Sequence, residues 1–192
     1  MTLRHRIVRR WTRLTLPWRY DFQTVSHCWC GGLLRGYMVD SGIGECVDCG
    51  TGVLRRRLTH AASLRFYESG DYRRSIHGTP IVGQEQFERG RRRGRVIADY
   101  LDSHGVPIAG QTVIELGSGA GGILAAMRER GAADVSGIDS DRGCRSRAWM
   151  NQIPTYGPSG SASVIPKQID LMILSHLLEH LYHPDLTLGM QA

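Results

Sequence analysis

The sequence predicts an α/β fold built on a parallel sheet, preceded by a small cysteine-rich module. Two observations carry this prediction. Residues 112–116 and 135–138 are strand-like apolar segments separated by a glycine-rich loop and a helical stretch, which is the order of a βαβ unit. In the first half of the chain, four cysteines lie in two close pairs among glycines, a pattern typical of a metal-stapled module.

Composition limits the class of protein. With 192 residues, 41% of them hydrophobic and 22% charged, the chain can bury one moderate core and a small metal-bound module. The net charge of +6 suggests an acidic partner such as nucleic acid, but the charge is concentrated at 1–19, 55–57 and 89–95, and all but one of the 24 basic residues are arginines. We therefore expect a small-molecule partner rather than nucleic acid.

No segment approaches the ~18 apolar residues that span a bilayer, and arginines interrupt the N-terminal apolar residues where a signal peptide would need a continuous core. The sequence therefore predicts a cytoplasmic protein without membrane association. Cysteines in close pairs fit metal binding in such a reducing compartment better than disulfides. Nothing in the sequence sets the oligomeric state.

The chain divides into four segments. Residues 1–25 form a basic extension without regular structure, 26–57 the cysteine module, 58–111 a helical linker, and 112–192 the α/β unit. A short strand is expected at 36–39 in the module.

The linker should contain a helix at 58–67, ended by Ser69-Gly70-Asp71, and a second helix at 84–103. Its arginine run at 89–95 is interpreted as a solvated face. The expected inner-face residues are Phe87, Val96, Ile97, Tyr100 and Leu101.

The α/β unit should continue with helices at 123–130 and 142–150, followed by a turn-rich stretch at 151–161. An edge strand is expected at 163–165. The apolar run at 169–174 suits a buried parallel strand, and a helix should begin at Ser175.

The loop from Gly117 to Gly122 follows a strand and opens a helix, so its backbone N–H groups are expected to face a polar or anionic ligand. It satisfies the dinucleotide pattern GxGxxG and the methyltransferase pattern GxGxG together. The alternative is a loop that only turns a strand into a helix.

Two acidic residues help to decide between these patterns. Asp139 ends the second strand and suits a ribose diol in either class. Glu115 lies two residues before the first glycine, where a carboxylate would repel a pyrophosphate but attract a sulfonium or an amino group. Glu115 therefore favours S-adenosylmethionine over a dinucleotide.

Three segments, VIELGSGAG from Val113, SGID ending at Asp139, and DLMILSHLLEH ending at His180, resemble the successive motifs of class I S-adenosylmethionine-dependent methyltransferases. The resemblance implies a Rossmann-like sheet and bound S-adenosylmethionine, with Asp139 on the ribose hydroxyls. The family often has an acidic residue for adenine after its third strand, and 161–168 contains none. The residues implied to line the cofactor are Glu115, Gly117, Ser118, Gly119, Gly121, Asp139 and Ser175.

The resemblance also implies a sheet of seven strands, of which this chain supplies about four. We therefore expect an incomplete sheet, the N-terminal half of a methyltransferase domain, from a truncated gene or a fragment. S-adenosylmethionine binding is a firmer expectation than turnover.

His176, Glu179 and His180 spell HxxEH, which on a helix would place two imidazoles on one face, as in the inverzincin metalloproteases. Such a protease needs a further ligand well downstream, and only twelve residues follow His180. In a methyltransferase, His176 or His180 would instead take a proton from a hydroxyl acceptor. The alternative for both histidines is helix capping or packing.

Fifteen residues separate Cys28-Trp29-Cys30 from Cys46-Val47-Asp48-Cys49, close to the spacing of a zinc ribbon. We predict a structural Zn²⁺ held by Cys28, Cys30, Cys46 and Cys49, because four closed ligands leave no position for chemistry. His27 is the substitute for Cys28, and reduced cysteines without metal are the alternative. Cys144 is expected to be a small buried residue.

The cysteine module also resembles N-terminal zinc-binding modules of bacterial methyltransferases that act on sugars or occur with polysaccharide genes. The segment from Phe66 to Tyr72 resembles the aromatic linker that follows such modules, so Tyr67 or Tyr72 could lie over the sulfonium or pack in the core. The predicted function is methyl transfer to a small-molecule or sugar-type acceptor. The alternatives are a fragment of an NAD-binding oxidoreductase and a non-catalytic zinc-ribbon binding protein.

Overall fold

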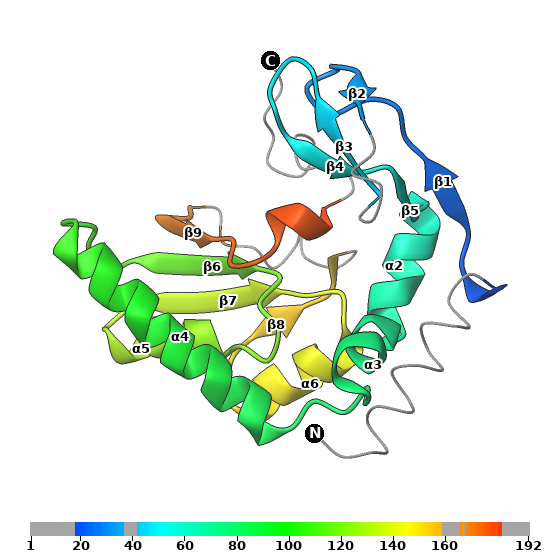
Figure 1. The fold of residues 1–192 in the computed structure, drawn as a ribbon. Coiled ribbons are helices and arrows are strands. Elements are labelled where there is room, and N and C mark those ends of the chain that lie inside the picture. Colours follow the sequence, from blue (N-terminus) through cyan, green and yellow to red (C-terminus); the bar gives the residue numbers. More distant parts are fainter. Residues whose placement is uncertain (1–17, 37–41, 159–165, 167, 182–192) are drawn as a thin grey trace.

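The computed structural model describes residues 18–36, 42–158, 166 and 168–181. Figure 1 shows a sheet with helices on one side and a smaller group of strands beyond the linker helices. In chain order the elements are β1 (Phe22–Thr24), β2 (Leu34–Arg35), β3 (Ile43–Cys46), β4 (Gly52–Leu54), β5 (Arg56–Leu58), α2 (His60–Glu68), α3 (Asp71–His77), α4 (Gln84–Ser103), β6 (Thr112–Leu116), α5 (Gly122–Glu129), β7 (Asp134–Ile138), α6 (Arg142–Met150), β8 (Thr155–Tyr156), β9 (Leu171–Ile173) and the 3-10 helix η2 (Leu178–His180).

The larger sheet is parallel and has the strand order β8-β7-β6-β9. The chain moves outward from β6 to β7 and β8, then crosses back to place β9 on the other side of β6. This reversal creates a switch point between β6 and β9, and ligands of open α/β sheets bind at the carboxyl ends of strands at such a point. The predicted Rossmann-like fold with about four strands is confirmed.

Helices α4, α5 and α6 cover one face of this sheet (Figure 1). The core between them joins Val113, Val135 and Ile173 of the strands to the helices, where Leu124 of α5 and Ala148 of α6 are fully buried. Apolar side chains at these positions are removed from water, which is the main favourable contribution to folding.

Glycines on α4 and α5 set the contact between these helices, and the predicted inner face of α4 is confirmed in part. A Cβ atom on Gly94 would lie 2.7 Å from the Ala126 side chain, and one on Gly122 would lie 2.2 Å from the Phe87 carbonyl oxygen. The buried face of α4 therefore consists of Phe87, Gly94 and Ala98. Ile97 and Leu101, also predicted to face inward, are partly buried against the core. Val96 and Tyr100 are exposed, contrary to the prediction, because two residues after Gly94 and Ala98 the helix has turned by about 200° away from the buried face.

The predicted segments 84–103, 112–116 and 142–150 are confirmed as α4, β6 and α6. Strand β8 lies in the stretch predicted to be turns; its two residues are too few for a sequence pattern to show. The third strand is thus β8, while the predicted strand 163–165 lies outside the described residues. The strand predicted at 169–174 is present but shorter, since β9 consists of Leu171–Ile173.

The cysteine module has an antiparallel sheet in the order β2-β3-β4. Of the strand predicted at 36–39, residues 37–39 lie outside the described residues. Strand β1, in the segment predicted to be an extension without regular structure, pairs antiparallel with β5. The end of that segment is therefore part of the fold.

Buried Asp71 connects this N-terminal segment to α3. Its carboxylate accepts a 2.6 Å hydrogen bond from the Tyr20 hydroxyl and pairs with Arg19 at 2.9 Å and with Arg74. A buried carboxylate requires such partners, so this cluster fixes the segment before β1 against the linker helices. None of the described helices combines the length and apolarity needed to cross a bilayer.

Candidate cofactor and metal sites

The glycine loop connects β6 to α5 at the switch point of the sheet. Gly117, Gly119 and Gly121 have φ values of 72°, 55° and 81°, which favour glycine. A Cβ atom on Gly119 would meet nothing within 4 Å, so this side of the loop is open to a ligand. One on Gly117 would lie 2.9 Å from the Leu177 side chain, so this glycine permits the segment after β9 to pack on the loop.

Several of the loop amides, which the sequence analysis expected to face a ligand, bond within the protein. The N–H groups of Gly117 and Ser118 donate to the Ile138 carbonyl at 2.8 and 3.1 Å, and that of Gly121 donates to the Ser118 carbonyl. The Ser118 side chain is buried over Gly137, where a Cβ atom would lie 2.4 Å from its Oγ. These three amides are therefore not directed at a ligand, which leaves fewer donors for a pyrophosphate.

Asp139, directly after β7, holds the loop in place. Its Oδ2 accepts a 2.7 Å hydrogen bond from the Gly119 amide, and its Oδ1 accepts one of 2.8 Å from the Asp141 amide. Burial raises the pKa of Asp139, although these two amides oppose that shift. The structure thus brings Asp139 and Gly119 together at the carboxyl ends of β6 and β7.

Glu115 lies inside the sheet, where β6 pairs with Gly137 of β7 and Ile173 of β9. The residue is 1% exposed, and its Oε2 has no hydrogen-bond partner among the described residues. Burial and the charge of Asp139 raise the pKa of Glu115 well above its ordinary value. Such a buried, unpaired carboxyl oxygen can accept a hydrogen bond from a ligand cation.

The histidine motif does not form the predicted α-helix. After β9 and half-buried Ser175, His176 has a φ of 54°, and only the 3-10 turn η2 follows. Exposed His176 lies 3.6 Å from the Glu179 carboxylate, while His180 faces the linker. The two imidazoles therefore do not share a helix face, and the metalloprotease arrangement is wrong.

His180 instead joins an aromatic cluster with Tyr67 and Tyr72. Its Nδ1 lies 3.0 Å from the Tyr67 hydroxyl, and its ring centroid lies 5.4 Å from that of Tyr72. Burial is the main cause that raises the pKa of both tyrosines, so both phenols stay protonated near neutral pH. The cluster connects the linker helices to the segment after β9.

A known protein family matches the region of the chain that contains this site. Residues 87–192, more than half of the chain, match a family described as a methyltransferase domain. The chain belongs to this family. The match begins within α4 and includes the glycine loop, Asp139 and the histidine motif, and it favours the methyltransferase prediction over the oxidoreductase alternative.

A comparison with curated proteins gave no significant match. Similar solved structures include a Thermoplasma acidophilum protein at 20% identity and a TM-score of 0.37, covering 48% of this chain and 54% of that one. Magnesium protoporphyrin IX methyltransferase from Synechocystis is similar in two structures. Its S-adenosylhomocysteine complex is 20% identical with a TM-score of 0.41, and the match covers 61% of this chain and 57% of that one. Its S-adenosylmethionine complex is 22% identical with a TM-score of 0.41, and the match covers 61% of each chain. The chain thus spans 54% to 61% of the length of these structures.

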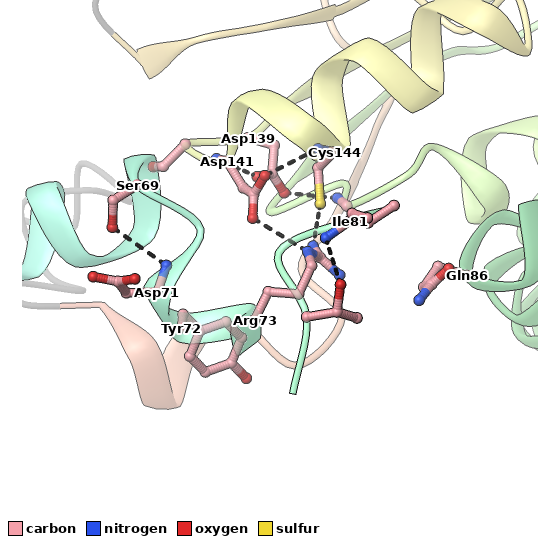
Figure 2. Close-up of polar contacts among 12 residues, drawn as sticks. Ser69, Asp71, Tyr72, Arg73, Ile81, Gln86, Asp139, Asp141 and Cys144 are labelled. Atoms are coloured by element: carbon pink, nitrogen blue, oxygen red, sulfur yellow. Dashed lines mark hydrogen bonds and ion pairs between the residues drawn. The ribbon is translucent and has the colours of Figure 1, made fainter. Parts of the chain in front are cut away.

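Sequence reasoning missed how α3 contacts the start of α6. Figure 2 shows Arg73 extending from α3 to Asp141 and Cys144. Its Nε donates to Asp141 Oδ2 at 3.3 Å and a second guanidinium nitrogen contacts Cys144 Sγ. Asp141 also caps α6 through the Cys144 amide at 3.0 Å. An aspartate before a predicted helix was a usable capping signal, whereas nothing in the sequence marked Arg73.

The structure brings the four predicted metal ligands together. The sulfur atoms of Cys28, Cys30, Cys46 and Cys49 all lie within 4.8 Å of one another, and Cys30 lies 3.4 Å from both Cys46 and Cys49. Tetrahedral zinc with sulfur ligands requires separations of about 3.8 Å, so the cluster fits the ion. The Thr51 hydroxyl and amide lower the pKa of Cys49 to about 6, which favours the thiolate.

His27 takes another partner, since its Nδ1 lies 3.0 Å from the Ser26 hydroxyl. The cluster among the described residues includes Cys28 and not its predicted substitute. Cys144 is buried in α6, as expected.

Proposed function

We propose that this chain binds S-adenosylmethionine at the carboxyl ends of β6 and β7 and transfers its methyl group to a small-molecule acceptor of the sugar type. The observation that carries the proposal is the pair of carboxyl groups beside the glycine loop: Asp139, which accepts the Gly119 amide, and buried Glu115, whose Oε2 has no partner among the described residues. Such a site suits a ligand with hydroxyl groups and a cationic end better than a diphosphate.

The residues of the site fit this cofactor. Asp139 would hold the ribose hydroxyls, because carboxylate oxygens that already accept two amides retain further lone pairs. Oε2 of Glu115 would accept a hydrogen bond from the ammonium group, and open Gly119 allows close approach. We assign Gly117, Ser118, Gly121 and Ser175 to shaping this site. The cofactor supplies an electrophilic methyl group on a sulfonium.

For transfer, the protein has to align the acceptor with this methyl group, since the displacement needs no covalent help. We assign His180 as the base for a hydroxyl acceptor and His176 as the second candidate. A proton can be accepted at Nε2 of His180 when its Nδ1–H donates to the Tyr67 oxygen, 3.0 Å away. Tyr67 is thus a positioning residue for His180.

The cysteine cluster is proposed to hold one structural Zn²⁺. Its four sulfur ligands would complete a closed tetrahedral shell, so the ion would stabilise the module without taking part in methyl transfer.

Calorimetry with S-adenosylmethionine, S-adenosylhomocysteine and NAD tests the cofactor assignment. Asp139→Asn should weaken S-adenosylhomocysteine binding by about tenfold or more, because a hydrogen bond to a charged group is lost. Asp134→Asn is the matched control, since exposed Asp134 lies at the opposite end of the same strand. Tight NAD binding without a response to either methionine derivative would overturn the proposal.

A further inference from the structure

A hollow lies outside the proposed cofactor site. It has a volume of about 440 Å³ and lies between the residues before β1, the end of α2 and the start of α6. Its lining residues are Arg19, Tyr20, Arg65, Glu68, Ser69 and Arg142. None of the residues assigned to the cofactor lines it, so the methyltransferase reaction does not account for it.

The lining carries an excess of positive charge, since three of its residues are arginines and one, Glu68, is acidic. Arg142 forms no ion pair with any residue in the described part of the chain. Arg65 lies 3.6 Å from Asp21, whose side chain is 81% exposed, so solvent screens this pair strongly. Among the described residues, Arg142 therefore has no carboxylate partner in an ion pair, and Arg65 has an exposed one.

The third arginine is held in a fixed position. Arg19 pairs at 2.9 Å with the fully buried Asp71, which also accepts the Tyr20 hydroxyl and pairs with Arg74. One carboxylate shared by two guanidiniums leaves Arg19 incompletely neutralised. The Asp71 cluster thus presents Arg19 and Tyr20 at the hollow wall.

We propose that this hollow binds the phosphate or diphosphate group of a small molecule. Guanidinium groups match phosphate oxygens in bidentate geometry, and three of them suit a multiply charged anion better than a single carboxylate. The hollow is open to solvent and, at about 440 Å³, has room for a diphosphate. The phosphate belongs either to a free ion or to a larger compound such as a phosphorylated acceptor; both present the same chemistry to the arginines.

Titration calorimetry with sodium pyrophosphate, inorganic phosphate and acetate tests this site on the intact chain. We expect affinity to fall in the order pyrophosphate, phosphate, acetate. The double variant Arg65→Gln, Arg142→Gln should weaken pyrophosphate binding by about tenfold or more, because charge-assisted hydrogen bonds are lost. A nucleoside diphosphate that binds more tightly than pyrophosphate identifies a larger compound as the source, and equal affinities identify the free ion.

Arg92→Gln is the control, because this substitution removes one positive charge from an exposed arginine of α4 that does not line the hollow. It should bind pyrophosphate as the wild type does. Equal affinity of the wild type and the double variant, or no binding of pyrophosphate at millimolar concentration, would overturn the proposal. S-adenosylhomocysteine binding is measured separately on each variant, so failure of this site is distinguishable from failure of the cofactor site.

Discussion

The cysteine module and the α/β unit are stabilised in different ways. Among the described residues, the buried cluster of the module consists of Cys28, Leu34, Cys46 and Val53, so half of it is potential metal ligand. The cluster of the α/β unit extends over three helices and three strands and consists almost entirely of aliphatic side chains. Because so little apolar surface is buried in the module, its stability should depend on a metal, whereas that of the α/β unit should depend on packing.

Loss of metal should have the largest effect and be confined to the module. Cys46→Ser, Cys49→Ser should abolish zinc binding and unfold the module, since structural zinc contributes about 10–16 kcal/mol in small zinc domains. Helical circular dichroism from α4, α5 and α6 should persist. Elemental analysis measures the zinc, with Cys144→Ala as the cysteine control outside the cluster. Full zinc content in the double variant, or none in the wild type, would contradict the assignment.

A cavity in the α/β core should destabilise the α/β unit and leave the cysteine module intact. Leu124 is fully buried in α5, so Leu124→Ala should lower the free energy of unfolding by about 2–5 kcal/mol, because the core cannot close around the missing atoms. Zinc content should be unchanged. Chemical denaturation measures the loss, with exposed Leu64→Ala of α2 as the control. A loss of zinc in Leu124→Ala would show that the two units are not independent in this way.

The smallest expected effect is the pH dependence caused by Glu115. Because its folded pKa is raised, the folded chain keeps a proton that the unfolded chain releases, so stability falls as pH rises above the ordinary glutamate value. The slope is at most about 1.4 kcal/mol per pH unit for one proton. Glu115→Gln should flatten the fall in unfolding temperature between pH 5 and pH 8 and also weaken S-adenosylhomocysteine binding.

Exposed Glu45→Gln on β3 provides the control for this effect and should keep the wild-type slope. If Glu115→Gln leaves the dependence of stability on pH unchanged, the Glu115 carboxyl group does not cause that dependence. A flattened slope with unchanged ligand affinity would separate Glu115 from the cofactor.

Local patterns were sufficient for much of the fold. The helix 142–150 follows an aspartate that caps it, and β6 is an apolar run ended by glycine, so neighbouring residues determine both. For α4 they gave the helix and the inward Phe87, Ile97 and Leu101, but not the role of Gly94, because the need for a glycine depends on how closely a distant helix approaches. They also failed at His176, whose left-handed backbone interrupts a pattern that would otherwise suit a helix.

The sequence alone determined the groups that carry chemistry here: two cysteine pairs, a glycine loop and an acid at the end of each of two strands. Spacing along the chain is enough for these, since each is local or repeats a short motif. Only the tertiary structure decided that the loop amides bond internally, that His180 meets Tyr67, and that Arg19, Arg65 and Arg142 surround one hollow. Most of these contacts join residues far apart in sequence, which meet only when strands and helices pack together, and no local pattern encodes them.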